Sequence, residues 1–327
     1  MIIGRVGTTF RFRTRRVCVV EPLRSLILAA ADNDVIRRVV ATAPGSRQIV
    51  ARFVAGESVA DALEVVHTIT ADGRRATLDY LGEYTSDPEL AERTVRTYLR
   101  LLDELAERRL AESVEVSVKL SALTVDGDEV LASRNLGLIC EAAADCGTTV
   151  TVDMEDHTTT DATLRAVRKA RRTWPWVGAV VQSYLRRTES DVATLAYEGS
   201  RVRLCKGAYA EPAEVAFTDA HAVDLSYVRC ANSLLAGGAY AMFATHDPRL
   251  VNVLRQRTRW YGRRQGSYEY QMLYGIRPDE QRRLAAEGET VRVYVPFGEH
   301  WYGYLMRRLA ERPANLALFL RALVSRS

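Results

Sequence analysis

The chain has 327 residues, of which 47% are hydrophobic and 26% are charged, a composition typical of a globular protein with one large domain or two smaller ones. Its formal net charge of +4 is concentrated at the N-terminus, because residues 1–24 hold six arginines against one glutamate, a local charge of +5 that leaves −1 for the remainder. A charge of −1 for residues 25–327 argues against nucleic-acid binding by that part of the chain. No apolar run approaches the length of a membrane span.

The basic segment 1–24 resembles a signal peptide only superficially, because Glu21 and Arg24 interrupt the apolar run that follows Arg15 and Arg16. We expect a flexible tail, with weak attraction to anionic lipid at the membrane surface as the alternative. Residues 25–70 are expected to form a helical arm, since residues 61–67 (DALEVVH) are periodic. Five scattered cysteines and five dispersed histidines favour a reducing cytoplasm and predict no metal site.

From residue 71 to residue 327 the chain alternates between short strand-like runs and segments with helical periodicity, among them 86–111, 160–172, 211–235 and 278–287. Such alternation predicts parallel strands. Eight units in this length match a (β/α)8 barrel, an α/β fold that typically needs about 250 residues. The candidate strands are residues 76–81, 114–120, 149–155, 177–185, 201–207, 240–246, 268–274 and 291–298.

A doubly wound open sheet is the main alternative to the barrel. Such a sheet would usually bind a nucleotide through a Gly-x-Gly-x-x-Gly turn, and the sequence contains no such motif. A P-loop and a Gly-x-Ser-x-Gly nucleophile elbow are also missing. The barrel is therefore the favoured fold.

The expected carboxyl ends of the strands are rich in polar and charged residues, which is where barrel enzymes carry out their chemistry. The chain uses only three lysines among its 45 basic residues, and two of them, Lys119 and Lys206, lie in or at the end of predicted strands. This usage indicates a need for a compact ammonium charge there. Each residue alone also has a structural explanation, for example a helix cap for Asp153 or a satisfied core histidine for His246.

The last periodic segment, residues 301–311, places Tyr304, Arg307, Arg308 and Glu311 on one helix face, at i, i+3, i+4 and i+7. Paired arginines beside a tyrosine suit the capture of a small carboxylate, because the guanidinium fork matches carboxylate geometry. A solvated charged helix is the alternative. With no metal cluster and no nucleophile paired to a base, this pattern favours a small amino or carboxylic acid held against an organic cofactor.

Nine segments together resemble the proline dehydrogenase family, specifically its monofunctional bacterial type. In this order, with about one segment per strand, they are highly specific, although each alone is weak. The segments are LDYLGE (78–83), SVKLSA (117–122), VTVDME (150–155), VVQSY (180–184), RLCKGAY (203–209), FATH (243–246), YEYQMLYG (268–275), RVYVP (292–296) and YLMRRLAE (304–311).

The resemblance implies a distorted (β/α)8 barrel that holds FAD non-covalently at its mouth, with the last helix lying across the top. L-proline is expected to lose a hydride from C5 to flavin N5, which gives Δ1-pyrroline-5-carboxylate. A membrane quinone is the expected electron acceptor, reached by a peripheral membrane contact, and a separate pyrroline-5-carboxylate dehydrogenase is expected to use the product.

The resemblance also implies roles on the substrate side. Arg307, Arg308 and Lys119 are expected to bind the proline carboxylate. Asp153 is expected to hold Lys119 or a tyrosine in place, and Glu83 to pair with Arg307 as a gate over the substrate. The expected walls of the ring site are Tyr209, Leu273, Tyr294 and Tyr304.

On the cofactor side, Arg203 is expected near flavin N5, so that Arg203, Lys119 and Asp153 are the expected catalytic residues. The clustered positive charges would disfavour the ammonium form of the substrate, and no dedicated general base is then required. The residues expected to touch the flavin or its phosphates are Gln182, Arg203, Lys206, Gly207, Thr245, His246, Gln271 and Glu311.

Two features depart from the longer bifunctional relatives. Those usually carry a Thr-Lys pair near the cofactor's ribose and pyrophosphate, whereas this chain has Phe217-Thr-Asp-Ala-His221, and Asp219 has the wrong sign for a phosphate neighbour. The short link between Tyr294 and Tyr304 favours a stand-alone enzyme. The alternatives are the same chemistry on another cyclic secondary amino acid such as hydroxyproline, a Schiff-base lyase with Lys206 as nucleophile, and a non-catalytic binding barrel.

Overall fold

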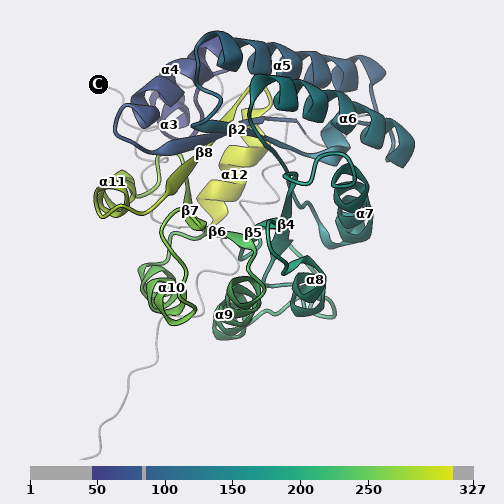
Figure 1. Ribbon diagram of the computed structural model, residues 1–327. Coiled ribbons are helices and arrows are strands. Elements are labelled where there is room, and N and C mark those ends of the chain that lie inside the picture. Colours follow the sequence, from purple (N-terminus) through teal and green to yellow (C-terminus); the bar gives the residue numbers. More distant parts are fainter. Residues whose placement is uncertain (1–45, 83–85, 312–327) are drawn as a thin grey trace, which may run out of the picture. The chain divides into compact units, whose positions relative to one another are not determined.

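The barrel consists of eight parallel strands that pair in chain order, and β1 pairs with β8 to close it (Figure 1). The structure is a computed structural model and describes residues 46–82 and 86–311. This closed ring confirms the predicted barrel and excludes the open sheet. The strands are β1 (Arg75–Tyr80), β2 (Val114–Val118), β3 (Val150–Val152), β4 (Gly178–Gln182), β5 (Arg201–Cys205), β6 (Tyr240–Ala244), β7 (Tyr268–Leu273) and β8 (Val291–Phe297).

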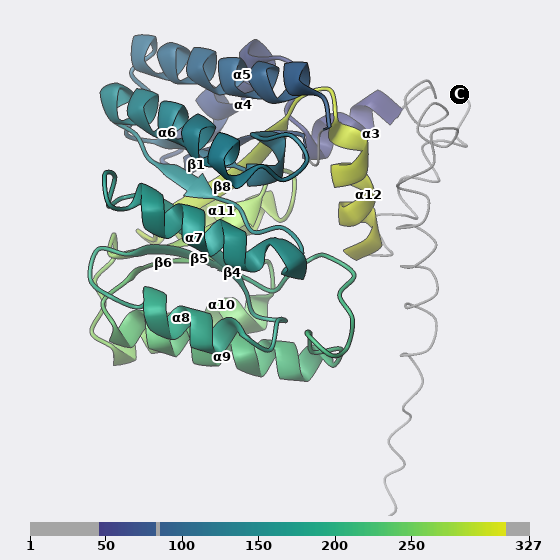
Figure 2. The same ribbon diagram turned by 90° about the vertical axis from the view of Figure 1, so that its right-hand side faces the viewer.

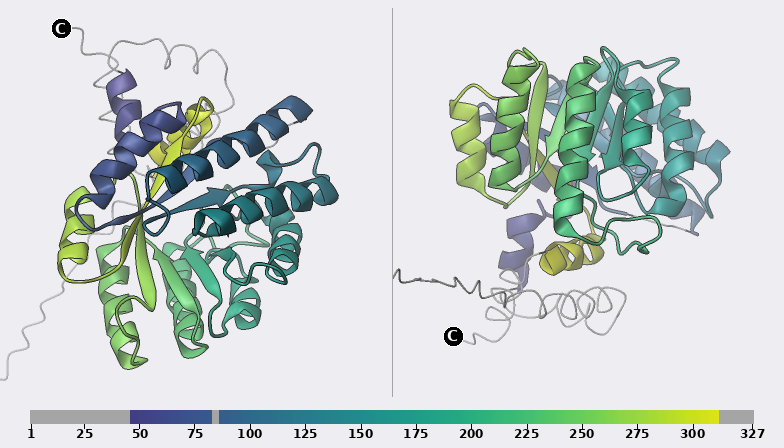
Figure 3. Two further views of the ribbon diagram at one scale, coloured as in Figure 1. Left: turned by 45° about the horizontal axis from the view of Figure 1, so that its top comes forward. Right: turned by 90° about the horizontal axis from the view of Figure 1, so that it is seen from below.

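Helices lie around the outside of the ring, and Figure 2 shows α5 to α9 following one another around it. Seen from below, these helices run alongside the strands, as the right-hand view of Figure 3 shows. Two 3₁₀ turns, η1 (Leu120–Ala122) and η2 (His157–Thr159), follow β2 and β3. The outer helices are α5 (Pro88–Glu107), α6 (Glu129–Cys146), α7 (Thr160–Ala170), α8 (Thr188–Leu195), α9 (Ala220–Ala236), α10 (Pro248–Trp260) and α11 (Pro278–Ala286).

Four of these helices begin at an aspartate that caps the first turn. The carboxylates of Asp87, Asp128, Asp219 and Asp247 each accept a hydrogen bond from a backbone N–H of α5, α6, α9 and α10 respectively. Such caps stabilise a helix start because the first N–H groups have no partner within the helix. The sequence thus fixes where each of these loops ends and its helix begins.

The strands alternate between an apolar face and a polar face. The apolar residues, such as Leu78, Val116 and Leu204, are fully buried members of the hydrophobic core. The intervening residues, such as Glu115 on β2 and Arg201 on β5, reach each other across the ring at 2.7 Å. Since contacts between strands so far apart in the ring require the inner face, the polar set fills the barrel interior, and the apolar set faces outward.

The predicted elements differ from the observed ones mainly at their ends. Strands β3 and β4 each end three residues before the predicted end. The predicted helix 211–235 is wrong at its start, since α9 begins at Ala220, nine residues later. Pro212 and the Asp219 cap account for this difference, and residues 211–219 form a loop that bonds to the turn after β4 instead.

The chain divides into two compact units, residues 48–301 and a second unit of residues 1–47 with 302–327. The first unit contains the barrel, most of α3 (Ser46–Phe53) and all of α4 (Val59–Thr70). Helix α4 packs on β1 and β8. It includes residues 61–67, so the helix predicted there is confirmed. The last helix, α12 (Trp301–Glu311), belongs almost wholly to the second unit. Its expected position across the barrel mouth and the domain boundaries at 24 and 70 stay predictions.

Candidate active site

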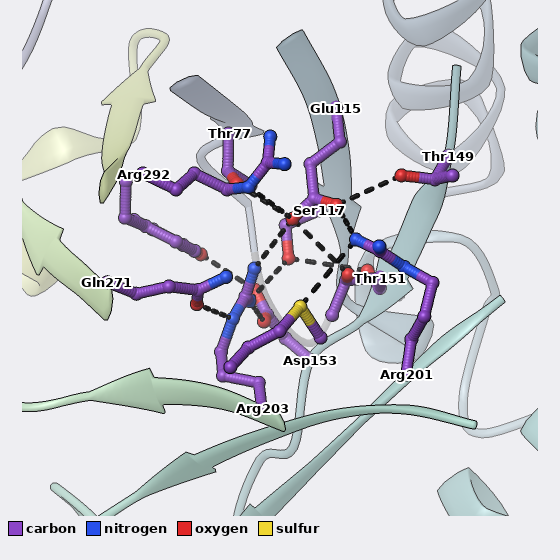
Figure 4. A network of polar contacts seen from close by, with 12 residues as sticks. Thr77, Glu115, Ser117, Thr149, Thr151, Asp153, Arg201, Arg203, Gln271 and Arg292 are labelled. Atoms are coloured by element: carbon purple, nitrogen blue, oxygen red, sulfur yellow. Dashed lines mark hydrogen bonds and ion pairs between the residues drawn. The ribbon is translucent and has the colours of Figure 1, made fainter. Parts of the chain in front are cut away.

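The barrel interior holds a network of buried charges centred on Glu115 of β2 (Figure 4). Its carboxylate accepts hydrogen bonds from Thr77 at 2.8 Å and Thr149 at 3.0 Å, and it forms an ion pair with Arg201 at 2.7 Å. Burial alone would raise the pKa of Glu115, but Arg292, Arg201 and Arg203 lower it to about 2. Glu115 therefore stays ionised in a dry environment, and it anchors three strands at once.

Glu269 of β7 is a second buried carboxylate in the same interior. It pairs with Arg292 of β8 at 2.7 Å and accepts hydrogen bonds from Tyr240 at 2.9 Å and Gln271 at 2.5 Å. Arg292 also donates to the carbonyl oxygen of Ala76 on β1 at 2.9 Å. These contacts connect β6, β7, β8 and β1 from the inside.

Arg203 of β5 lies between these carboxylates and the end of β3. Its guanidinium donates to Gln271 at 2.6 Å, to Asp153 at 2.6 Å and to Ser117 at 2.9 Å, and it lies 5.2 Å from the centre of the Tyr294 ring. Although burial opposes the charge, Asp153 and Glu115 keep the pKa of Arg203 above its ordinary value. The guanidinium is therefore a fixed cation with a fixed orientation.

Asp153 accepts a hydrogen bond from Tyr294 of β8. The Tyr294 hydroxyl donates to it at 2.6 Å. Burial and the Asp153 charge raise the pKa of Tyr294, so this hydroxyl keeps its proton. A tyrosine was one of the two partners expected for Asp153, and its role in holding that tyrosine in place for substrate stays a prediction.

Lys119, at the end of β2, pairs with Asp79 of β1. The ammonium lies 2.7 Å from both Asp79 oxygens, and the two residues are 7% and 1% exposed. Burial raises the pKa of Asp79, although the Lys119 charge opposes that shift. Part of the Lys119 charge is therefore compensated inside the barrel.

Lys206 lies in a different setting, in a group of charges at the rim of the barrel that we call the rim cluster: Lys206, Asp224, Asp247 and Arg249. The Lys206 ammonium is 2.6 Å from Asp224 and 3.4 Å from Asp247, and its side chain is 36% exposed. Arg249 pairs with both carboxylates, at 3.1 and 2.7 Å. Asp219, the residue of unexpected sign, caps α9 by accepting from Ala222 N–H at 2.8 Å.

The remaining expected cofactor residues lie at the ends of β4, β6 and β7. Gln182 donates to the Glu155 carbonyl oxygen at 2.8 Å. The Nε2 atom of His246 accepts from the Leu273 backbone N–H at 2.9 Å, so a neutral His246 ring carries its proton on Nδ1. Thr245 accepts from the Asp247 N–H at 3.2 Å. All three are tied to backbone groups, which fixes their positions.

Gly207 and Tyr209 lie in the loop after β5. Gly207 has a φ of +111°, and a β-carbon there would come within 2.3 Å of the Tyr184 ring. Both facts require glycine at this position regardless of any cofactor. Tyr209 is half-buried in the same loop.

Residues expected on the last helix lie outside the barrel unit. In α12, Arg308 stacks over the Tyr304 ring at 5.2 Å, as their i, i+4 spacing predicts. Glu83 lies outside the described residues, as do the side chains of Arg307 and Glu311. The expected gate between Glu83 and Arg307 stays a prediction.

Sequence reasoning missed the inner-face charges Asp79, Glu115, Arg201, Glu269 and Arg292. The signal that identifies them is their period of two within the strands, as in Glu115, Ser117 and Lys119. When charged residues recur at every second position of a strand, that face of the strand usually points to solvent. In a barrel surrounded by helices, however, the outer face is covered, so a charged face points inward.

Within the described ranges no group of three or more His, Cys, Asp or Glu side chains could hold a metal ion. The same ranges contain no helix that is both long and apolar enough to cross a membrane.

Comparison with known proteins identifies the family. The proline dehydrogenase family model matches residues 62–320. Proline dehydrogenase 1 of Bacillus subtilis strain 168 is 36% identical over 93% of this chain and 100% of its own length. The proline dehydrogenase of Deinococcus radiodurans is 38% identical over 84% of this chain and 89% of its own.

Among solved structures, proline utilization A (PutA) from Bdellovibrio bacteriovorus, inactivated by N-propargylglycine, is similar with a TM-score of 0.76 and 26% identity. The similarity covers 85% of this chain but only 34% of that longer protein. On the family match and the two near-full-length relatives, the chain belongs to the proline dehydrogenase family.

Proposed function

We propose that this protein oxidises L-proline to Δ1-pyrroline-5-carboxylate with non-covalently bound FAD as the hydride acceptor and a quinone as the final electron acceptor. Members of the proline dehydrogenase family are oxidoreductases of proline catabolism, and this chain is one of them. The observation that carries the proposal is the convergence of Lys119, Arg203 and Tyr294 on the buried carboxylates Asp79 and Asp153.

The chemistry of the donor set at the strand ends fits a flavin nucleotide. Gln182, the last residue of β4, and Gln271 within β7 offer amides. Lys206 and Thr245, which directly follow β5 and β6, offer an ammonium and a hydroxyl. We propose that these side chains hold the cofactor, with Lys206 near a phosphate. FAD, when bound, would supply the hydride acceptor that no protein side chain can provide.

The N-terminus of α9 is not available as a second phosphate-binding site beside Lys206. The N-terminus of that helix is already capped by the Asp219 carboxylate. A phosphate at this helix end would meet a negative charge rather than free N–H groups. We therefore propose that the phosphates bind on the Lys206 side of the rim, away from Asp219.

On the substrate side, we propose that Lys119, Arg307 and Arg308 bind the proline carboxylate and that Tyr294, Tyr209, Leu273 and Tyr304 surround the ring. Oxidation requires the ring nitrogen to lose a proton and C5 to lose a hydride, so that the carbon and nitrogen become joined by a double bond. Because Lys119 is partly neutralised by Asp79, the arginines are left to disfavour the protonated amine. Positioning then supplies much of the remaining rate acceleration.

The surroundings of Lys206 argue against the Schiff-base lyase. A nucleophilic lysine needs an unprotonated amine, and that form is favoured by burial or by neighbouring positive charge. Lys206 instead forms ion pairs with two carboxylates, at 2.6 and 3.4 Å. The flavin-dependent reaction is therefore the better account of the site.

The first test is an anaerobic visible spectrum of the purified protein, reconstituted with FAD, before and after addition of L-proline. We expect a flavin band near that of the free cofactor, which bleaches with proline. A flavin band that does not change with L-proline but bleaches with trans-4-hydroxy-L-proline would identify hydroxyproline as the substrate instead. A colourless protein that borohydride traps with a carbonyl compound would support the lyase instead.

The electron acceptor and the product's fate need separate measurements. Reoxidation of the reduced protein should be faster with a short-chain quinone than with dioxygen. Released pyrroline-5-carboxylate should be trapped by o-aminobenzaldehyde and oxidised by a separately added pyrroline-5-carboxylate dehydrogenase. Binding to anionic vesicles, compared between the full chain and one lacking residues 1–24, tests the proposed peripheral membrane contact.

A further inference from the structure

The loop between β5 and α9 follows the strand that carries Arg203, and it contains Tyr209. It is not helical, and it is fastened to the turn after β4. Phe217 N–H donates to the Tyr184 carbonyl oxygen at 2.7 Å, and Arg186 N–H donates to the Val215 carbonyl oxygen at 2.9 Å. The second half of the loop, residues 212–217, is therefore held by ordinary backbone pairing.

The first half of the loop is held by the side chain of Tyr184, which is 8% exposed. Its hydroxyl donates to Glu211 at 3.1 Å. Its ring lies against Gly207, where a β-carbon would come within 2.3 Å. One phenol thus contacts two positions of the loop, and these lie on either side of Tyr209 in the sequence.

The Glu211 carboxylate continues this connection to another part of the barrel. It accepts hydrogen bonds from the backbone N–H of His157 at 2.9 Å and from the Nδ1 of the same residue. His157 begins η2, four residues after Asp153. The Glu211 side chain is 3% exposed and the His157 side chain 32%. A buried carboxylate with these donors joins the loop after β5 to the loop after β3.

We propose that Glu211, Tyr184 and His157 are positioning residues that hold Tyr209 in the conformation in which it binds substrate. We call these three residues the latch. This inference rests on the proposed function, in which Tyr209 forms part of the wall around the proline ring. None of the three has to touch substrate, since they hold the loop at Gly207 and Glu211, on either side of Tyr209.

The expected kinetic signature follows from the role. If the latch is broken, the loop spends a smaller fraction of time in the binding conformation. The apparent affinity for proline then falls in proportion to that fraction. Substrate at saturation restores the conformation, so kcat is expected to change little. A purely structural defect would instead lower the amount of folded enzyme and leave KM unchanged.

Tyr184→Phe is the most informative variant, because it keeps the ring against Gly207 and removes only the hydroxyl. Losing the bond to Glu211 should raise KM for proline about tenfold, with kcat within about twofold of the original enzyme. Glu211→Ala should raise KM at least as much, and Glu211→Gln should rescue part of it. The amide oxygen of glutamine can still accept from the backbone N–H of His157.

Glu214→Gln is the matched control, since Glu214 is an exposed carboxylate three residues further along the same loop. Its KM should match that of the unaltered enzyme. His157→Ala removes the ring but keeps the backbone N–H, so its increase in KM should be smaller than that of Glu211→Ala. An unchanged KM in Tyr184→Phe and Glu211→Ala would overturn the proposal.

A second measurement separates the latch from the proposed function. Amide hydrogen exchange of the peptide spanning residues 206–219 should be about tenfold faster in Tyr184→Phe and Glu211→Ala, and unchanged in Glu214→Gln, with no proline present. If the protein does not oxidise proline but this exchange pattern appears, the loop is latched and the proposed function is wrong. If it oxidises proline but exchange is identical in all variants, the latch is wrong.

Discussion

The barrel interior and the rim cluster each contain a carboxylate whose pKa is lowered to about 2, but for different reasons. In the interior, Glu115 is buried, and the charges of three arginines overcome the cost of burial. In the rim cluster, Asp247 is lowered mainly by hydrogen bonds from Arg249, whose side chain is 76% exposed. Similar pKa values therefore arise in a dry network and in a wet one.

The difference teaches which charges this fold depends on. Ions in the interior have exchanged water for protein partners, so removing one partner leaves another charge stranded. Ions at the rim keep contact with water and salt, which can replace a lost partner at small cost. The same contrast separates Lys119 from Lys206, two lysines that the sequence alone presents as equivalent.

The largest effect is expected from Lys119→Met. This change strands the Asp79 carboxylate, which is 1% exposed. The free energy of unfolding should fall by about 3–5 kcal/mol, as measured by urea denaturation. Oxidation of proline should fall by more than about a hundredfold, because a buried charge for the substrate carboxylate is lost.

The double variant Lys119→Met with Asp79→Asn provides the control. Removing the stranded charge should recover much of the stability, while proline oxidation stays low. If Lys119→Met alone were as stable as the original protein, the ammonium and carboxylate would not be coupled as the 2.7 Å contacts indicate.

The second-largest effect is a loss of folding stability at low pH, caused by protonation of Glu115. The pKa of Glu115 is lowered from 4.5 in an ordinary glutamate to about 2, so its contribution to stability is complete above about pH 4.5 and is lost as pH falls toward 2. That contribution should amount to about 3 kcal/mol, at about 1.4 kcal/mol per pKa unit. Urea denaturation between pH 6 and pH 3 should show a shallower pH dependence in Glu115→Gln, and equal slopes would count against this assignment.

A smaller effect is expected at the rim. Lys206→Met should lower the free energy of unfolding by less than about 1 kcal/mol, because the ammonium is partly exposed and Arg249 remains beside both carboxylates. Retention of FAD on gel filtration should fall at the same time if Lys206 contacts a phosphate. A loss of stability as large as that of Lys119→Met would remove the distinction between interior and rim.

The smallest effect is expected from Asp247→Asn. Asparagine can still cap α10, so only the charge is lost, and the change should be about 0.5 kcal/mol or less. Raising the salt concentration to 1 M should abolish it. The acid sensitivity attributed to Glu115 should persist in the same salt, which makes the pair of experiments a direct comparison of the two regions.

The barrel was predictable from the sequence because its signal is repeated eight times. Runs such as residues 291–298 alternate, helical segments separate them, and aspartate caps mark several helix starts. The ends of elements were less accurate, as for residues 211–219, where loop contacts with Tyr184 replace the expected helix. Such tertiary contacts leave no local pattern.

The polar residues of the site were located more completely than their partners. Lys119, Asp153, Arg203 and Tyr294 were all expected to have a role, and the structure brings them within one barrel interior. Asp79 was missed because the alternating polar residues of its strand, Arg75, Thr77 and Asp79, were not interpreted as the inner face of a barrel. The pairing of each cation with its carboxylate depends on the register around the closed ring, which a sequence does not display.

The closing seam of the barrel has a consequence for how the chain is made. Six residue pairs join β1 to β8, from Arg75 with Arg292 to Tyr80 with Phe297. At about 5–20 residues per second, a ribosome needs roughly 10–40 s to make the stretch between them. During that time one edge of β1 has no partner strand, and an open edge can pair with another chain. Yield during synthesis should therefore depend on how fast the stretch between β1 and β8 is translated.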